Sequence, residues 1–144
     1  MKKYLEYIVN EIHSVVLATT DENGNPVTCV IDMMHYDESS LYFLTATTKN
    51  FYKRLKQNEN IAITGFKGED TMSCNSINII GKAKEIGTDM LMELFDKNSY
   101  MYDIYKTEES RKILTVFKIY EGKGQFYDLS QKPIFTENFI FGNR

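Results

Sequence analysis

The stretch LYFLTATTKNFYKRLKQNENIAITGF, residues 41–66, predicts a strand, a helix and a second strand in direct succession. It opens with LYFLTA, which is typical of a buried strand, and it closes with NIAITGF, which is typical of another. Between the two, Thr48 is a suitable N-cap, and Phe51 and Leu55 lie one helical turn apart. The stretch therefore predicts a short amphipathic helix that connects two strands.

This helix carries positive charge where the helix macrodipole is itself positive. Lys49 and Lys53 fall in its first turns, where carboxylates are favoured and lysines are not. As like-charged i,i+4 neighbours they also cost about 0.2–0.5 kcal/mol. A solvated face of an amphipathic helix has the same appearance. The alternative is an anion site made by these lysines, the helix N–H groups and the hydroxyls of the preceding TATT.

The composition favours one domain over residues 1–144, with a single hydrophobic core. A net charge of −3 argues against a general nucleic-acid binder. No apolar run is long enough to span a membrane, and the N-terminus lacks the apolar segment of a signal peptide. Cys29 and Cys74 form no CxxC motif, so we expect no metal site. We expect a cytoplasmic protein with free thiols.

The rest of the chain predicts a mainly β protein with peripheral helices. Several short strands separated by frequent turns favour a closed antiparallel barrel with helices outside. Gly81 suggests a bulge or a close backbone approach within its strand. We expect helices at residues 2–13, 88–105 and 107–113, strands at residues 14–20, 27–36 and 72–86, a hairpin at residues 114–129 that turns at Gly122 and Gly124, and an irregular tail after it.

The order of these elements resembles the pyridoxamine 5'-phosphate oxidase-like FMN-binding split-barrel superfamily. The resemblance rests on residues 41–66, on IIGKAKEI at residues 79–86 and on LTVFKIYEGKGQFYDLSQKPI at residues 114–134, and it covers nearly the whole chain. It implies a six-stranded antiparallel split β-barrel with flanking α-helices. It also implies a homodimer with two FMN molecules at the dimer interface.

The same resemblance implies where FMN would bind. In the family, the second strand passes the flavin ring, which here points to the backbone of Val30, Ile31 and Asp32. Many relatives carry basic residues near the positions of Cys29 and Phe51, so Lys49 and Lys53 would supply the charge in this chain. The phosphate is held where the third strand ends and the next helix begins, which corresponds to Thr45, Thr47, Thr48, Lys49 and Lys53.

The resemblance implies an FMN-dependent oxidoreductase that moves a hydride or electrons between a reduced nicotinamide and a small acceptor. The alternatives are a non-catalytic flavin carrier or sensor, and a barrel that binds haem or a deazaflavin. Haem would need His35 as its axial ligand. An electron-transfer partner would be a separate protein, because the chain has no cysteine cluster. With no Trp and no Arg-x-His motif near the C-terminus, we do not expect an authentic pyridoxamine 5'-phosphate oxidase.

No general acid or base is evident, so the catalytic residues are unknown at this stage. Asp32 either faces solvent or forms hydrogen bonds near the flavin or substrate, with a perturbed pKa. His13 ends the first predicted helix, where a cation suits the dipole, and we interpret it as structural. Tyr100, Tyr102 and Tyr105 are expected to serve the core or an interface.

Overall fold

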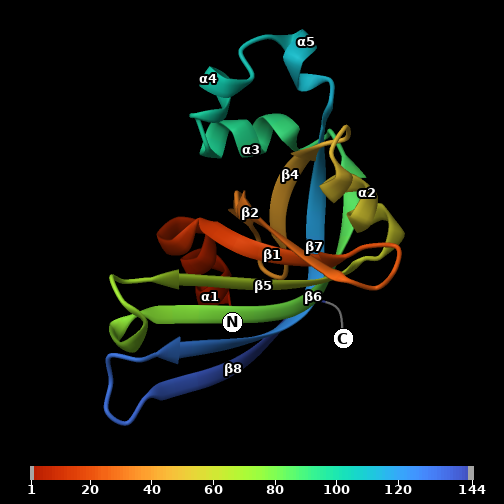
Figure 1. Cartoon of the computed structure of the whole chain (residues 1–144). Coiled ribbons are helices and arrows are strands. Elements are labelled where there is room, and N and C mark those ends of the chain that lie inside the picture. The colour runs from red at the N-terminus through yellow and green to blue at the C-terminus, as the bar shows by residue number, and fades with distance from the viewer. Residues whose placement is uncertain (1, 143–144) are drawn as a thin grey trace.

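The structure is a computed structural model that describes residues 2–142. Its strands form one curled antiparallel sheet with short helices at the periphery, which confirms the predicted split-barrel class (Figure 1). The sheet has eight strands within the described residues, whereas six were expected. The strands are β1 (Ser14–Thr20), β2 (Pro26–Asp32), β3 (His35–Tyr36), β4 (Leu41–Ala46), β5 (Asn60–Lys67), β6 (Asn75–Gly87), β7 (Leu114–Asp128) and β8 (Phe135–Gly142).

The helices are short and interrupted. Residues 2–13 were expected to form one helix, but an α-helix gives way there to a π-helix. The predicted helix at residues 88–105 is likewise broken into two. The helices are α1 (Lys2–Tyr7), the π-helix η1 (Ile8–Ile12), α2 (Asn50–Gln57), the 3-10 helix η2 (Thr71–Ser73), α3 (Leu91–Lys97), α4 (Met101–Ile104) and α5 (Glu108–Arg111).

The barrel is completed by a short crossing of the chain between β2 and β3. The strands pair in the order β2-β1-β5-β6-β7-β4-β3, so the two ends of the sheet are consecutive in sequence. Met33 donates its N–H to the His13 carbonyl (2.7 Å), and Met34 donates its N–H to the Tyr42 carbonyl (2.9 Å). Both methionine side chains are buried. The predicted single strand at residues 27–36 is therefore wrong, because the chain changes partner at these two residues.

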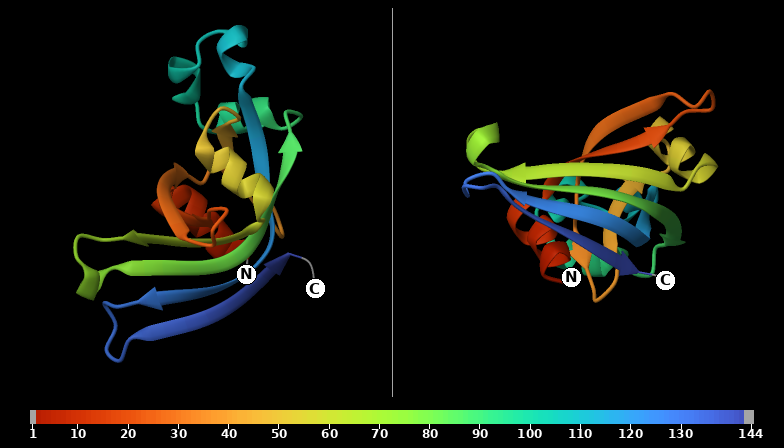
Figure 2. Two further views of the ribbon diagram at one scale, coloured as in Figure 1. Left: turned by 45° about the vertical axis from the view of Figure 1, so that its right-hand side comes forward. Right: turned by 90° about the horizontal axis from the view of Figure 1, so that it is seen from below.

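The predicted hairpin at residues 114–129 is also wrong. These residues form the single strand β7, which pairs with β4 along its first half and with β8 along its second half. The tail that was expected to be irregular supplies β8. Figure 2 shows the resulting layer, in which β5, β6, β7 and β8 run side by side.

Glycines in β6 and β7 are required by packing inside the sheet and not by turns. A Cβ on Gly122 would lie 2.7 Å from the ring of Phe141. Gly81 is paired directly with Gly122, and a register shift follows it at Lys82/Ala83. A Cβ on Gly81 would lie 2.6 Å from the carbonyl oxygen of Glu121, so the predicted close backbone approach is confirmed.

The hydrophobic core has two parts. The larger fills the inside of the curled sheet and includes the stacked rings of Phe43 and Phe117, with centroids 5.6 Å apart. The smaller lies beneath α3, α4 and α5 and contains Leu94 and Phe95. These three helices form a separate layer at one end of the barrel (Figure 1). The side chain of Asn98 links this layer to the crossing, because its amide donates to the Met34 carbonyl (2.9 Å).

We expect Gly81→Ala to lower the free energy of unfolding by about 1–3 kcal/mol, because the new methyl group would meet a backbone atom that cannot rotate away. Urea denaturation measures the change. Lys82→Ala, at the neighbouring exposed position, is the control and should stay within about 0.5 kcal/mol of the parent chain. Equal stability of the two variants would contradict the close approach.

Candidate functional site

The predicted anion site lies at the N-terminus of α2. The N-cap is Lys49 and not Thr48, and no side chain caps the helix there. The side chains of Thr48, Lys49 and Lys53 are exposed. Within residues 2–142, neither lysine forms an ion pair. The helix therefore begins with backbone N–H groups that lack a capping side chain, beside two uncompensated cations.

The two threonines that precede this helix start are placed differently. Thr47 is half-buried and donates its backbone N–H to the Ile113 carbonyl (2.7 Å). Thr45 is only 5% exposed and is paired with Thr115 on β7. The structure thus brings Thr47, Thr48, Lys49 and Lys53 to one accessible end of α2, with Thr45 beneath them.

Glu85 on β6 accepts hydrogen bonds from three side chains near α2. Its carboxylate accepts hydrogen bonds from Thr115 Oγ1 (2.7 Å), Tyr52 Oη (3.0 Å) and Lys56 Nζ (3.0 Å). Partial burial alone would raise the pKa of Glu85, but these three hydrogen bonds lower it overall. Lys56 is therefore neutralised, unlike Lys49 and Lys53.

Arg54 is a further cation of α2 that the sequence interpretation did not assign to the site. Its Nε donates to Thr19 Oγ1 on β1 (2.8 Å). Burial raises the pKa of the Cys29 thiol on β2, and the positive charges of Arg54 and Lys49 act in the opposite direction. Those charges therefore lie near β2. The spacing between Phe51 and Arg54 could have indicated this, because residues three apart share a helix face.

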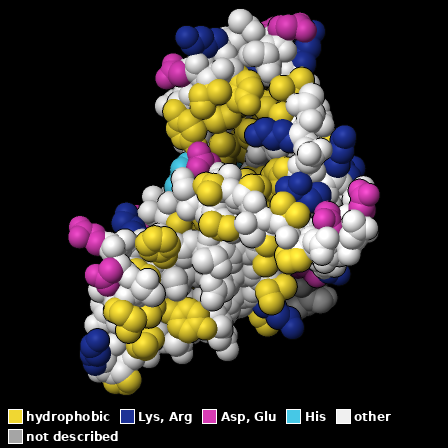
Figure 3. Space-filling model, in the orientation of Figure 1, with side chains coloured by type: hydrophobic (Ala, Val, Ile, Leu, Met, Phe, Trp, Pro, Cys, Tyr) yellow, Lys and Arg dark blue, Asp and Glu magenta, His cyan; other side chains and the backbone are white. Residues whose placement is uncertain are grey.

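The three candidates on β2 point in different directions. Val30 is 71% exposed on the outer face of the sheet, while Ile31 and Asp32 are half-buried. Figure 3 shows a hollow between the helices at one end of the molecule and the strands below them. Hydrophobic side chains and Lys or Arg side chains border this hollow.

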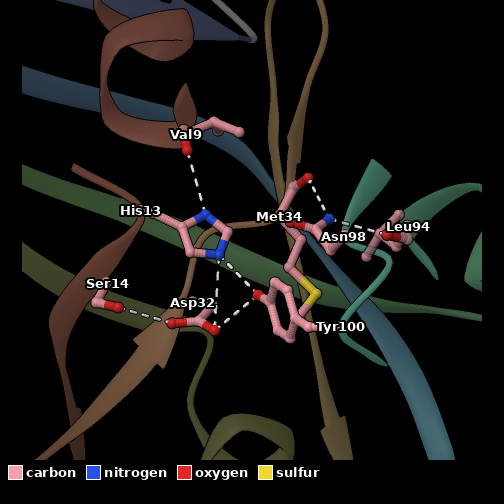
Figure 4. Close-up of polar contacts among 8 residues, drawn as sticks. All are labelled: Val9, His13, Ser14, Asp32, Met34, Leu94, Asn98 and Tyr100. Carbon is pink, nitrogen blue, oxygen red and sulfur yellow. Dashed lines mark hydrogen bonds and ion pairs between the residues drawn. The ribbon is translucent and has the colours of Figure 1, made fainter. Parts of the chain in front are cut away.

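Asp32 lies in a cluster of three titratable side chains that come from three separate segments of the chain (Figure 4). Tyr100, next to α4, donates its hydroxyl to Asp32 Oδ2 (2.7 Å), and the same hydroxyl lies 2.7 Å from His13 Nε2. His13 Nε2 lies 3.6 Å from Asp32 Oδ2. Ser14 donates to the other carboxylate oxygen (2.9 Å). Asp32 thus forms hydrogen bonds within the protein while its side chain stays 30% exposed, and its predicted place near a flavin or substrate stays a prediction.

The backbone of His13 is strained. Its φ of 66° and ψ of −64° match the rare form of the γ-turn, which L-residues seldom adopt. Such a conformation costs about 1–3 kcal/mol. His13 also follows a π-helix, a rare element that is frequent at functional sites. His13 thus ends the first helical segment as predicted, but it follows a π-helix and has a positive φ, which the sequence did not indicate.

A polar cavity of about 600 Å³ adjoins His13. It lies between η1, β3 and the end of α3, and His35, Lys97 and Asn98 also line it. His35 Nε2 lies 3.1 Å from a carboxylate oxygen of Glu93. Burial lowers the pKa of His35, and the charge of Glu93 only partly opposes this effect. This imidazole is therefore neutral near pH 7.

Comparison with known proteins identifies the family. A protein-family model described as pyridoxamine 5'-phosphate oxidase matches residues 1–123, and the chain belongs to this family. The predicted resemblance is confirmed. No curated protein matches the sequence closely enough to count as a relative.

Solved structures share the fold at low sequence identity. A NimC/NimA family protein from Clostridium acetobutylicum has a TM-score of 0.79 at 20% identity, covering 98% of this chain and 92% of that one. A protein from the same organism related to general stress protein 26, of the pyridoxinephosphate oxidase family, has a TM-score of 0.67 at 18% identity (99% and 96%). A heme binding protein from Mycobacterium smegmatis has a TM-score of 0.71 at 11% identity (92% and 55%).

Two further observations concern metal ions and membrane-spanning helices. In the part of the chain that the structure describes, no three His, Cys, Asp or Glu side chains are grouped closely enough to hold a metal ion. Between residues 2 and 142, every helix is too short or too polar to cross a lipid bilayer.

Backbone strain at His13 predicts that a glycine there is better tolerated than an alanine. Both substitutions remove the imidazole, but only glycine adopts φ of 66° without a steric penalty. We expect His13→Gly to be more stable than His13→Ala by about 1 kcal/mol or more in urea denaturation. If alanine is equally stable, the backbone at this position is not strained.

Proposed function

We propose that the protein binds FMN and acts as an oxidoreductase between a reduced nicotinamide and a small acceptor. The observation that carries the proposal is the uncapped start of α2 with the unpaired Lys49 and Lys53. A helix start with free N–H groups and adjacent cations fits a phosphate group. Membership of the pyridoxamine 5'-phosphate oxidase family supports FMN as the source of that phosphate.

The residues fit such a group in most of the predicted positions. The exposed Thr48, Lys49 and Lys53 and the half-buried Thr47 would hold the phosphate, whereas the buried Thr45 would support them. The backbone of β2 from Val30 to Asp32 would face the flavin ring. Bound FMN would supply hydride or electron transfer, and the protein would supply position and electrostatics.

We also propose a homodimer that uses the outer face of the sheet. Ile80 is 72% exposed in the middle of this face, although it is a large apolar side chain. One row of directly paired, exposed and uncharged residues crosses six strands, which gives this face a band without charge next to Ile80. The row consists of Val30, Val16, Thr64, Asn78, Gln125 and Asn138.

Haem is a second candidate ligand, because one solved structure with this fold is described as a heme binding protein. His35 was the predicted axial ligand. Its Nε2 lies 3.1 Å from the Glu93 carboxylate, so the imidazole would first have to leave this contact to bind iron. FMN is therefore the better supported cofactor. An absorption spectrum of the purified protein distinguishes flavin from haem directly.

Replacing Lys49 and Lys53 together with alanine should weaken FMN binding by at least about tenfold, since each charge-assisted hydrogen bond contributes about 1.5–3 kcal/mol. Fluorescence titration of FMN measures the change. Riboflavin, which lacks the phosphate, should bind the parent chain and the double variant equally poorly.

A second double variant, Lys106→Ala with Lys112→Ala, changes the net charge equally but lies beside α5. It should bind FMN like the parent chain. Wild-type FMN affinity in the Lys49/Lys53 variant would show that these lysines form only a solvated face.

The proposed dimer predicts twice the 16.8 kDa chain mass by light scattering at micromolar concentration. Ile80→Glu should shift this mass toward the monomer, because it buries a charge in the interface. Ile104→Glu is the matched control, since Ile104 is equally an exposed isoleucine but lies on α4. A monomeric parent chain, or a dimer unaffected by Ile80→Glu, would contradict this interface.

A further inference from the structure

The cluster of His13, Tyr100 and Asp32 holds a proton that its hydrogen bonds require. His13 Nδ1 lies 3.2 Å from the Val9 carbonyl, which can only accept, so this nitrogen carries a hydrogen. Tyr100 Oη has contacts of 2.7 Å to both His13 Nε2 and Asp32 Oδ2, but a phenol has a single hydrogen. The second contact needs one further proton, on Nε2 or on Oδ2.

This proton is held where a ligand can reach it. The side chains of His13 and Asp32 are each 30% exposed, and Tyr100 is 38% exposed. His13 also borders the cavity of about 600 Å³, which is large enough for a small ring compound, whereas Tyr100 and Asp32 are not among the residues that line it. The cluster is therefore accessible and is not a sealed structural network.

The same cavity is lined by a second polar group, the side chain of Asn98. Asn98 is 7% exposed, and its amide nitrogen donates to both the Met34 carbonyl (2.9 Å) and the Leu94 carbonyl (2.8 Å). Both amide hydrogens are thereby used, and the structure shows no hydrogen bond to its carbonyl oxygen among residues 2–142.

We propose that Tyr100, backed by His13 and Asp32, is the proton donor for a small conjugated carbonyl substrate of the quinone class. The proposal rests on the proposed flavin function for its reductant, a dihydroflavin. Hydride addition to a quinone leaves negative charge on an oxygen, which a positioned phenol can protonate. Hydride transfer alone would leave an anionic product, and the phenol supplies the proton that makes this product neutral.

The protons and electrons balance as follows. The quinone accepts a hydride, which brings two electrons, and its oxygen takes the hydroxyl proton of Tyr100. Tyr100 recovers a proton from the shared position on His13 or Asp32, and water returns that proton to the cluster. The product is a hydroquinone, and the oxidised flavin is the other product.

The geometry allows Tyr100 to turn toward a substrate without leaving a charge unpaired. His13 Nε2 is already 3.6 Å from Asp32 Oδ2, so the imidazole can pair with the carboxylate when the phenol turns away. Burial, the hydrogen bond to Asp32 and its negative charge all raise the pKa of Tyr100. The phenol is therefore protonated at neutral pH and depends on the further proton of the cluster to replace the one it gives up.

The first test compares two acceptors with the FMN-loaded protein and a reduced nicotinamide. A 1,4-naphthoquinone needs a proton, whereas ferricyanide takes electrons alone. Tyr100→Phe should lower quinone turnover by about 10²-fold, the usual contribution of a general acid, and leave ferricyanide turnover unchanged. Tyr102→Phe is the matched control, because it also removes a hydroxyl that donates to an aspartate, Asp96, and should change neither rate.

The second test needs neither flavin nor turnover. The phenolate of 4-nitrophenol resembles the oxyanion, and its absorbance reports binding to the protein. Tyr100→Phe should weaken this binding by at least about tenfold, while Tyr102→Phe leaves it unchanged.

The two tests separate the proposals. Absent ferricyanide turnover in the parent chain would overturn the flavin function, while the nitrophenolate titration still decides the role of Tyr100. Absent nitrophenolate binding in the parent chain, unchanged binding in Tyr100→Phe, or an equal loss with both acceptors would overturn the role of Tyr100 as a proton donor.

Discussion

The backbone of Met33 and Met34 joins the two ends of the sheet, and both the barrel and the cluster depend on it. The N–H of Met33 is bonded to the carbonyl of His13, and the carbonyl of Met34 accepts the amide of Asn98. The first contact fixes the strained His13 beside Asp32, and the second anchors the end of α3, which carries the chain toward Tyr100. Because the methionine side chains are buried, the crossing cannot shift without opening the core.

The sequence predicted correctly those strands and helices whose pattern depends only on neighbouring residues in the chain. The strand at residues 41–46 was predicted at its observed bounds, because its apolar run ends where the helix begins. Gly122 and Gly124 misled the interpretation because they occur in a polar stretch that looks like a turn. Because these two glycines have no side chain, the rings of Phe141 and Phe139 on the neighbouring strand β8 can pack against them. Sequence alone does not show that long-range contact, so one strand was interpreted as a hairpin.

The candidate site likewise has one part that the sequence indicated and another part that only the structure shows. Lys49 and Lys53 were identified from the sequence because their unusual feature, positive charge near a helix start, depends only on neighbours in the chain. His13 follows η1, Asp32 ends β2 and Tyr100 precedes α4, and no sequence spacing links the three residues. The backbone angle of His13 also has no sequence signal, since histidine is compatible with an ordinary helix end. The cluster that we propose as the acid–base group is thus brought together by the fold and has no local sequence signal.

Strand β2 connects the two parts of the site. At one position, Cys29 lies within reach of the positive charges of Lys49 and Arg54, and three residues later Asp32 enters the cluster with Tyr100. Three residues of extended strand span about 10 Å. The charges of α2 thus act on the middle of β2, and the proton-holding cluster lies at its end, an arrangement compatible with a phosphate-bearing cofactor and a proton donor that serve one substrate. This spacing is the structural reason for treating the two proposals as one site.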